Sequence, residues 1–285
     1  MNQPVVVDTV LALRAAIRDW RRDGLSVAMV PTMGALHDGH ISLVRAALST
    51  ADRCIVSIFV NPAQFAPTED LDKYPRQLVR DLDRLTHAGA HLAFTPTVSE
   101  MYPEGFATKI SVGGPSSGLE SDFRPTFFEG VATVVAKLFL QALPDHAIFG
   151  EKDYQQLCVV RKLCRDLDLP VDIVGAPTVR DAHGLAMSSR NAYLSAAELD
   201  AARQLNVILR QAAAALAAGT DESSVTAKAA ASLLEAGFDS VDYVAARESL
   251  TLAPWRRDSD GRLLAAAWLG RTRLIDNVEV SSFIP

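Results

Sequence analysis

Short, continuous apolar runs alternate with helical patterns through most of the chain, and this alternation constrains the fold. A strand that is covered by helices on both faces needs no polar side chains, so the runs indicate buried strands. These strands are expected at residues 26–30, 53–60, 91–95, 147–149 and 171–175. Helical patterns stand between them, at residues 41–48, 77–88, 130–142 and 153–167. The order predicts an α/β fold with a doubly wound, Rossmann-like parallel sheet, in which ligands bind at the carboxyl ends of strands.

The pattern changes after residue 176, where two helices come first and strands follow. The expected elements cover residues 196–218, 223–236, 240–245, 263–269 and 272–278. Helices followed by strands predict a smaller α+β unit. We therefore expect a Rossmann-like domain over residues 1–176 that binds ligand, and a second domain over residues 177–285 that closes over it.

Composition excludes several classes of protein. The chain has 285 residues, a formal net charge of -6 and no long basic run, which disfavours a nucleic-acid partner. No uncharged apolar stretch approaches the roughly 18 residues of a membrane span, and the first residues lack the pattern of a signal peptide. Cys54, Cys158 and Cys164 have no paired spacing. Their odd number favours reduced thiols and a cytoplasmic protein, and their spacing is not that of a zinc site.

The segment Pro31–His40, PTMGALHDGH, follows the first buried run and leads into a helix. Helix N-termini present free N–H groups and suit phosphate, and Gly34 and Gly39 let the backbone approach a ligand. One histidine near a helix start is usually a cap. Here His37 and His40 bracket Asp-Gly, which resembles the HxGH motif of nucleotidyltransferases that split ATP between its α- and β-phosphates.

Two further polar clusters follow predicted strands. In NPAQF, Asn61 and Gln64 offer amide donors and acceptors that suit a small hydroxy acid, although Asn-Pro is also a common turn. In GEKDYQQ, Lys152 can place a charge on phosphate, Asp153 can accept from a ribose hydroxyl, and Gln156 follows one turn later. The alternative reading of this second cluster is a plain charged helix start.

Two more candidates lie elsewhere in the chain. Met187-Ser188-Ser189-Arg190 offers hydroxyls and a guanidinium for a phosphate clamp, or else forms a turn before a helix capped by Ser195. Arg124 can pair with a substrate carboxylate, or can be an ordinary surface arginine.

Read together, these motifs are similar to those of the pantothenate synthetase (pantoate–β-alanine ligase) family. The matching segments, in order, are PTMGALHDGH, IFVNPAQF, DLDKYPR, VAKLFLQ, FGEKDYQQL, APTVR, GLAMSSRN and RTRLIDN, over about residues 5–280. The resemblance implies ATP-dependent condensation of (R)-pantoate with β-alanine through a pantoyl adenylate, with release of AMP and pyrophosphate. It further implies ATP and Mg2+, and a cytoplasmic homodimer.

The resemblance also implies roles for individual residues. ATP would be bound by Met33, Gly34, Ala35, Leu36, His37, Asp38, Gly39, His40, Gly150, Glu151, Lys152, Asp153, Val179, Met187, Ser188, Ser189 and Arg190. The catalytic residues among them would be His40, His37, Lys152, Ser188, Ser189 and Arg190, with His40 at the family's proton-donor position. Gln64 and Gln156 would grip pantoate, with Asn61 and Arg124 added from the residue patterns, and Asp81 matches a position linked to Mg2+.

The chain departs from the family pattern at two positions. Arg80 stands beside Asp81 where many relatives have an acidic residue, so substrate phosphates are expected to supply most of the Mg2+ ligands. Phe127 stands where the family usually has histidine, and a phenyl ring cannot donate a hydrogen bond. Two alternatives stay open from the residues: a nucleotidyltransferase that acts on a phosphorylated alcohol, and a nucleotide-binding protein without activity.

Overall fold

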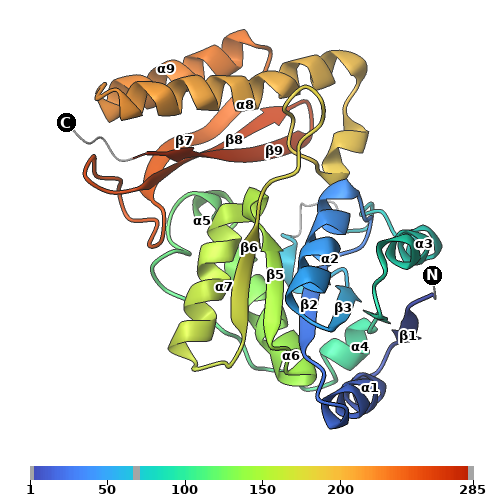
Figure 1. Cartoon of the computed structure of the whole chain (residues 1–285). Helices are drawn as coiled ribbons and strands as arrows, with labels where there is room; N and C mark the ends of the chain where they lie inside the picture. The colour runs from blue at the N-terminus through green and yellow to red at the C-terminus, as the bar shows by residue number, and fades with distance from the viewer. Residues whose placement is uncertain (1–2, 67–70, 282–285) are drawn as a thin grey trace.

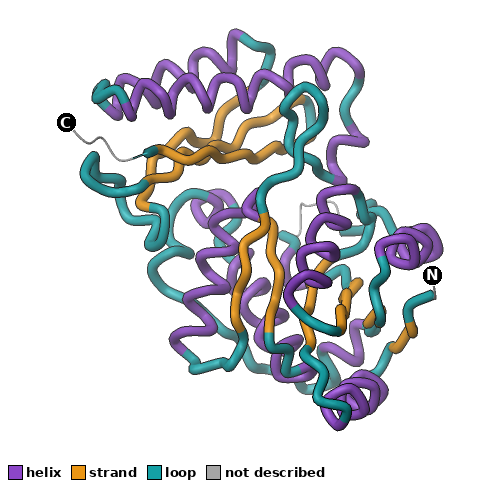
Figure 2. The backbone as a smooth tube through the Cα atoms, viewed as in Figure 1, coloured by secondary structure: helices purple, strands orange, loops and turns teal. Residues whose placement is uncertain are grey.

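The computed structural model describes residues 3–66 and 71–281. The motif DLDKYPR begins at Asp70, which lies outside them. The chain forms a six-stranded parallel sheet with helices on both faces and a three-stranded antiparallel sheet with two long helices on one face (Figures 1 and 2). The α/β fold with a smaller α+β part is thus confirmed.

The parallel sheet contains all of the strands expected before residue 177. Its strands are β1 (Val5–Val7), β2 (Val27–Thr32), β3 (Arg53–Ile58), β4 (Leu92–Phe94), β5 (His146–Gly150) and β6 (Asp172–Ala176). They lie in the order β1-β4-β3-β2-β5-β6, and every pair is parallel. β2 runs through Thr32, so the first two residues of the PTMGALHDGH segment belong to the strand.

Along the chain, the helices of this part alternate with the strands. They are α1 (Val10–Arg22), α2 (Asp38–Thr50), α3 (Leu78–Ala88), α4 (Val98–Met101), α5 (Glu120–Phe123), α6 (Phe127–Ala142) and α7 (Tyr154–Asp166). Two short 3₁₀ turns occur among the described residues of this part, η1 (Pro62–Gln64) and η2 (Glu151–Asp153), and η3 (Ser189–Tyr193) follows after β6. Each turn coincides with a polar cluster of the sequence.

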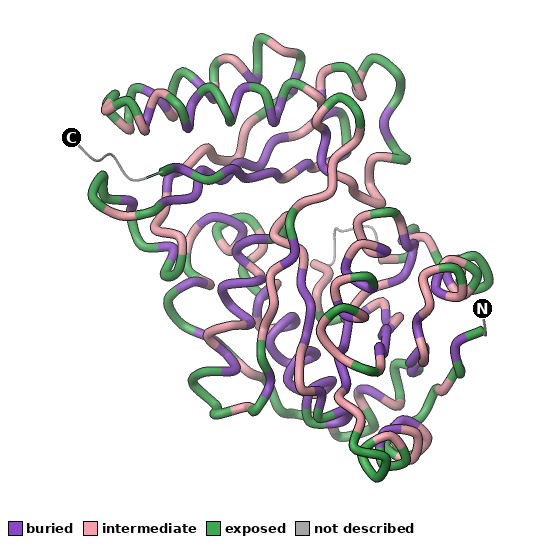
Figure 3. Tube along the Cα trace, viewed as in Figure 1, coloured by how far each residue is buried: buried purple, intermediate pink, exposed green. Residues whose placement is uncertain are grey.

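The continuous apolar runs arise because the sheet is covered on both faces. In β2, Val27 and Met29 pack in a cluster with α1, α6 and α7, whereas Ala28 and Val30 pack in another with α2 and α3. All four side chains are fully buried, and the inner strands β2, β3 and β5 are largely coloured as buried in Figure 3. Alternate side chains of a strand point to opposite faces, so both sets must be apolar.

The second part begins after Ala176, at the predicted boundary, although the division into domains stays a prediction. It contains α8 (Ala196–Ala217), α9 (Glu222–Glu235), β7 (Ser240–Glu248), β8 (Gly261–Leu269) and β9 (Thr272–Val280). The two helices pack on one face of the sheet and share a hydrophobic cluster with it. Within the described residues, no helix has both the length and the apolar character that crossing a membrane requires.

A buried ion cluster joins the two parts. The Arg273 guanidinium on β9 lies 2.6 Å from Glu120 of α5 and 2.6 Å from Asp242 of β7. The Tyr243 hydroxyl donates to Glu120 at 2.8 Å, and burial raises the pKa of this phenol well above its usual range. The cluster therefore fixes one end of β9 against α5, which belongs to the part of the chain with the parallel sheet.

Helix α6 approaches η1 so closely that a side chain at Gly130 is excluded. A Cβ added to Gly130 would lie 2.2 Å from the Ala63 carbonyl oxygen. The Gly130 carbonyl also accepts a hydrogen bond from Asn61 at 3.1 Å. The glycine therefore sets the position of the turn that carries Gln64.

We expect Gly130→Ala to destabilise the chain by about 1–3 kcal/mol, because the added methyl group overpacks this contact. Urea unfolding measures the change in the free energy of unfolding. Gly113→Ala is the matched control, since nothing lies within 4 Å of its added Cβ. Equal stabilities of the two variants would contradict the close packing of α6 on η1.

Candidate active site

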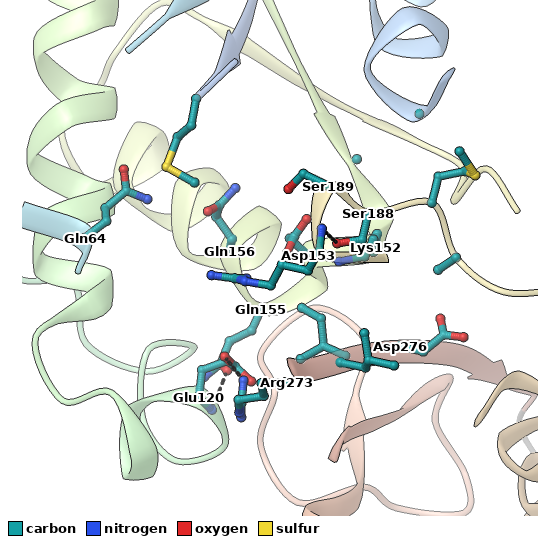
Figure 4. A pocket seen from close by; sticks show the side chains of 18 of the residues that line it. Gln64, Glu120, Lys152, Asp153, Gln155, Gln156, Ser188, Ser189, Arg273 and Asp276 are labelled. Atoms are coloured by element: carbon teal, nitrogen blue, oxygen red, sulfur yellow. Dashed lines mark hydrogen bonds and ion pairs between the residues drawn. The ribbon is translucent and has the colours of Figure 1, made fainter. Parts of the chain in front are cut away.

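A cavity of about 1020 Å³ lies between the carboxyl ends of the parallel strands and the small antiparallel sheet. Residues after β2, β3 and β5 line one side, and residues of β9 and of the segment before η3 line the other. In the view of Figure 4, Gln64 lies at one end, Lys152, Ser188 and Ser189 lie toward the other, and Gln156 lies between them. The predicted location of the site, at the carboxyl ends of the strands, agrees with this cavity.

The loop after β2 is held from behind by Asp81. One carboxylate oxygen accepts from the Ala35 amide at 3.0 Å and the other from the Leu36 amide at 2.8 Å. Asp81 is 1% exposed, and burial raises the pKa of its carboxyl group, although the two amides favour the charged form. Gly34 adopts a φ of 81° directly in front of this carboxylate, where a Cβ would lie 3.1 Å from it.

His37 and His40 form a reciprocal capping box at the start of α2. The His40 Nδ1 accepts from the His37 amide, and the His37 Nδ1 accepts from the Gly39 amide, each at 3.2 Å. A neutral imidazole that accepts at Nδ1 carries its hydrogen on Nε2. The geometry therefore leaves each ring one N–H donor, and both rings line the cavity.

Both imidazoles are neutral near pH 7. Burial, and secondly the charge of Lys152, lowers the pKa of His37 to about 4. Burial, and secondly His37, lowers the pKa of His40 to about 3. The two rings lie 4.1 Å apart, so a proton on one disfavours a proton on the other.

Lys152 is the principal cation at the end of β5. It lies in η2, lines the cavity, and its Nζ is 3.8 Å from the Asp153 carboxylate. Asp153 occupies the N-cap of α7 without making a side-chain capping bond, so its carboxylate is available to a ligand. Glu151 turns away from the cavity toward Arg262, at 3.7 Å.

Asn61 orients Gln64 rather than lining the cavity. Its Nδ2 donates to the Gln64 Oε1 at 2.9 Å. Its Oδ1 accepts from the Tyr102 hydroxyl at 2.8 Å and from the Ala63 amide at 3.2 Å. Asn61 is 1% exposed, so the arrangement presents the Gln64 side chain to the cavity while Asn61 stays behind it.

Phe127, one of the two predicted departures from the family pattern, supports Arg124. The Arg124 guanidinium carbon lies 3.7 Å from the centre of the Phe127 ring. Arg124 also donates to the Gln64 carbonyl at 3.1 Å. Both side chains line the cavity, so the phenyl ring acts as a platform that directs a cation toward the Gln64 end.

The segment that leads into η3, together with the first residues of η3, supplies the opposite wall. Met187, Ser188, Ser189 and Arg190 line the cavity, and the Ser188 hydroxyl caps η3 by accepting from the Arg190 amide at 3.3 Å. Val179 also lines it and accepts from the Met187 amide at 2.9 Å.

Most predicted contact residues reach the cavity, and seven do not. Those that line it are Met33, His37, Gly39, His40, Gln64, Arg124, Gly150, Lys152, Asp153, Gln156, Val179, Met187, Ser188, Ser189 and Arg190. Those that do not line it are Gly34, Ala35, Leu36, Asp38, Asn61, Asp81 and Glu151. These seven residues lie outside the cavity wall, where several of them bond to neighbouring protein groups, and their contact with ATP, substrate or metal stays a prediction.

The proposed metal ligand Asp81 does not fit a metal cage. Both of its carboxylate oxygens bond to loop amides, and the residue is buried behind the loop. In the described ranges, no three His, Cys, Asp or Glu side chains are grouped so that they could hold a metal ion. Burial also raises the pKa of Cys54 to about 12, and of Cys158 and Cys164 to about 11, so these thiols are protonated.

Several cavity residues were not predicted from the sequence, and Ser57 and Asn277 are two of them. Ser57 on β3 lines the cavity, is 1% exposed, and its hydroxyl has no partner among the described residues. The available signal was one hydroxyl within the apolar run RCIVSIFV. Asn277 on β9 also lines the cavity, and its signal was an uncharged amide beside Asp276 in RTRLIDN.

The lowered histidine pKa values predict how stability depends on pH. The unfolded chain binds protons at histidine near pH 6.5, whereas folded His37 and His40 do so at about 4 and about 3. The free energy of unfolding should therefore fall as the pH drops from about 7 to about 5. His40→Asn should make this dependence shallower in urea unfolding, whereas His87→Asn, at an imidazole that is 69% exposed, should not. An NMR titration of His40 centred near pH 6.5 would contradict the assignment.

Comparisons with known proteins agree with the motifs and the fold. The family model described as pantoate-beta-alanine ligase matches residues 5–279. A pantothenate synthetase of Mesorhizobium japonicum is 76% identical over 280 residues, covering 98% of this chain and 99% of the relative. One from Caulobacter vibrioides is 54% identical over 284 residues, covering 98% of this chain and all of the relative.

Solved structures give the same result. The crystal structure of pantothenate synthetase from Thermus thermophilus has a TM-score of 0.86 and 45% identity, covering 97% of this chain and 99% of that one. Pantoate-beta-alanine ligase from Francisella tularensis, complexed with beta-gamma ATP and beta-alanine, has a TM-score of 0.82 and 32% identity, covering 96% and 97%. This chain therefore belongs to the pantoate-beta-alanine ligase family.

Proposed function

We propose that this chain condenses (R)-pantoate with β-alanine at the expense of ATP, releasing AMP and pyrophosphate. One observation carries the proposal: a single cavity has groups suited to phosphate toward one end, the Gln64 carboxamide at the other end and the Gln156 carboxamide between them. The groups suited to phosphate are His37, His40, Lys152 and the Ser188–Arg190 segment. The relatives named above support the same reaction.

The adenylation step needs no protein nucleophile. A pantoate carboxylate oxygen attacks the α-phosphorus of ATP, the bond to the bridging oxygen breaks, and pyrophosphate leaves with the electron pair. Negative charge grows on the leaving oxygens, where Lys152, Arg190 and the Ser188 and Ser189 hydroxyls would stabilise it. Catalysis then rests on alignment and electrostatics.

The role proposed for His40 is that of a neutral hydrogen-bond donor. Its pKa of about 3 makes an imidazolium unavailable near pH 7, and its Nδ1 already accepts a backbone amide. The Nε2–H would therefore donate to a phosphate oxygen without transferring its proton. His37 would act in the same way.

The second step joins the two acids. The neutral amine of β-alanine attacks the acyl carbon of the pantoyl adenylate, the acyl–oxygen bond breaks, and AMP leaves while the nitrogen loses a proton. Arg124, held over Phe127 at the Gln64 end, is suited to a substrate carboxylate.

The remaining expectations form part of the same proposal. Mg2+ would be held chiefly by phosphate oxygens and water, since Asp81 does not offer a free carboxylate edge. Three free, buried cysteines support a reducing, cytoplasmic setting. We also propose that the chain divides into domains over residues 1–176 and 177–285. We further propose that it forms a homodimer, and light scattering tests this by measuring the mass in solution.

An AMP-release assay in which each substrate is omitted in turn tests the function. We expect AMP only when ATP, pantoate and β-alanine are all present, and scrambling of a labelled bridging oxygen in ATP with pantoate alone. A dinucleotide-like product would indicate a nucleotidyltransferase. ATP binding without any product would indicate a binding protein, and either result would overturn the proposal.

Phe127→Ala should raise the KM of a carboxylate substrate, pantoate or β-alanine, because the platform under Arg124 is lost. A cation–π contact of about 0.5–2 kcal/mol corresponds to an increase of roughly 2- to 30-fold. Phe127→His, which keeps a planar ring, is the matched control and should change KM less. The KM of ATP should stay unchanged, and steady-state kinetics with each substrate varied gives all three values.

A further inference from the structure

We infer that Asp276 and Asn277, neighbours on β9, are positioning residues that hold the two phosphate-binding segments at the separation adenylation requires. The inference rests on the proposed function and concerns side chains for which that function assigned no role. One segment is η2 with Lys152, and the other is the loop that leads to Ser188–Arg190.

Asn277 fixes η2 from the small sheet. Its Nδ2 donates to the Glu151 carbonyl at 2.9 Å and to the Lys152 carbonyl at 3.0 Å. Its Oδ1 accepts from Arg262 at 3.1 Å, which determines which end of the amide faces η2. Asn277 is 3% exposed, so these bonds are shielded from water. The backbone that carries Lys152 is thus tied to β9 by an uncharged side chain.

Asp276 fixes the other segment. Its carboxylate receives both Nη groups of Arg180, at 2.7 and 2.8 Å, and the Asn206 amide of α8 at 3.2 Å. Arg180 in turn donates to the Gly184 carbonyl at 3.0 Å. Residues 180–186 form a bridged turn, since Arg180 pairs with Ala186, and Met187 follows directly. The carboxylate therefore anchors the base of the loop that carries the two serines and Arg190.

The two anchors work as a pair because they are consecutive in one strand. Successive side chains of a strand point to opposite faces. Asp276 faces α8 and the loop base, and Asn277 faces η2. The Asp276 carboxylate also accepts the Asn277 amide at 2.7 Å, which links the anchors directly. A shift of β9 therefore moves both segments relative to the phosphates.

This arrangement predicts a defect confined to one half-reaction. Lys152 and the Ser188–Arg190 segment are proposed to stabilise the departing pyrophosphate, which is present in adenylation and absent from the attack of β-alanine on the adenylate. Misplaced groups lower the rate of the step they serve, by about 100-fold for a displacement of about 1 Å. A role in stability alone would lower both half-reactions together.

The test is Asn277→Asp, which keeps the shape but turns an acceptor toward the two η2 carbonyls, together with Asp276→Asn, which weakens the Arg180 pair. For each variant, adenylation is followed by pyrophosphate release with ATP and pantoate. The second half-reaction is followed by AMP release from synthetic pantoyl adenylate with β-alanine. We expect adenylation to fall about ten- to 100-fold and the KM of ATP to rise, with the second half-reaction unchanged.

Val280→Ala is the control, because Val280 is a buried residue of the same strand within the small sheet's hydrophobic cluster. It should lower Tm without changing the ratio of the two half-reactions. Parallel loss of both half-reactions in the Asp276 and Asn277 variants, or loss of neither, would overturn the inference. If Asn277→Asp does not fold, Asn277→Ala removes the amide without burying a charge and is judged in the same way. A wild-type chain that forms no adenylate would instead refute the proposed function.

Discussion

The site depends on the two hydrogen bonds that form the capping box at the start of α2. Backbone amides occupy the Nδ1 atoms of His37 and His40, so the chain itself fixes the tautomer of both rings. Burial then keeps the rings uncharged. A helix N-terminus already attracts anions through its free amides and dipole. The box adds two neutral donors at this position, and the loop held by Asp81 sets where they point.

In this cavity, some residues line the wall and others hold those lining residues in place. Asp81, Asn61 and Gly130 touch no part of it, yet each determines where a lining group stands. Asn61 illustrates the principle, because its donor and acceptor atoms are all bonded to protein groups, which leaves Gln64 to face a ligand. Asn61 and Asp81 use their polar side chains to hold neighbouring residues, which explains why polarity alone does not mark contact residues.

The difference between lining and supporting residues also determines how much of the site the sequence could predict. The buried strands and the positions of the polar clusters follow from local periodicity, and the structure has them within a few residues. Whether Asn61 or Gln64 faces the cavity depends on Tyr102 and Gly130, which are distant in sequence. Asp81 and Asn277 act through hydrogen bonds to segments 45 and 125 residues away, so no local pattern reveals them. Phe127 stands out in the sequence as a departure from the family pattern, but its stacking under Arg124 depends on how the segment before α6 folds.

The ion cluster of Glu120, Asp242 and Arg273 has a consequence for the cavity as a whole. The two walls also meet through apolar contact, since Leu252 and Leu264 of the smaller part pack in the hydrophobic cluster of the parallel sheet. The ion cluster adds a polar tie between the walls, made of side chains that are 7–12% exposed. At about 0.1 M ionic strength, mobile ions screen exposed charges that lie more than about 10 Å apart, whereas they screen a buried pair much less. The width of this cavity should therefore depend little on ionic strength, even though the ligand proposed to enter it is highly charged.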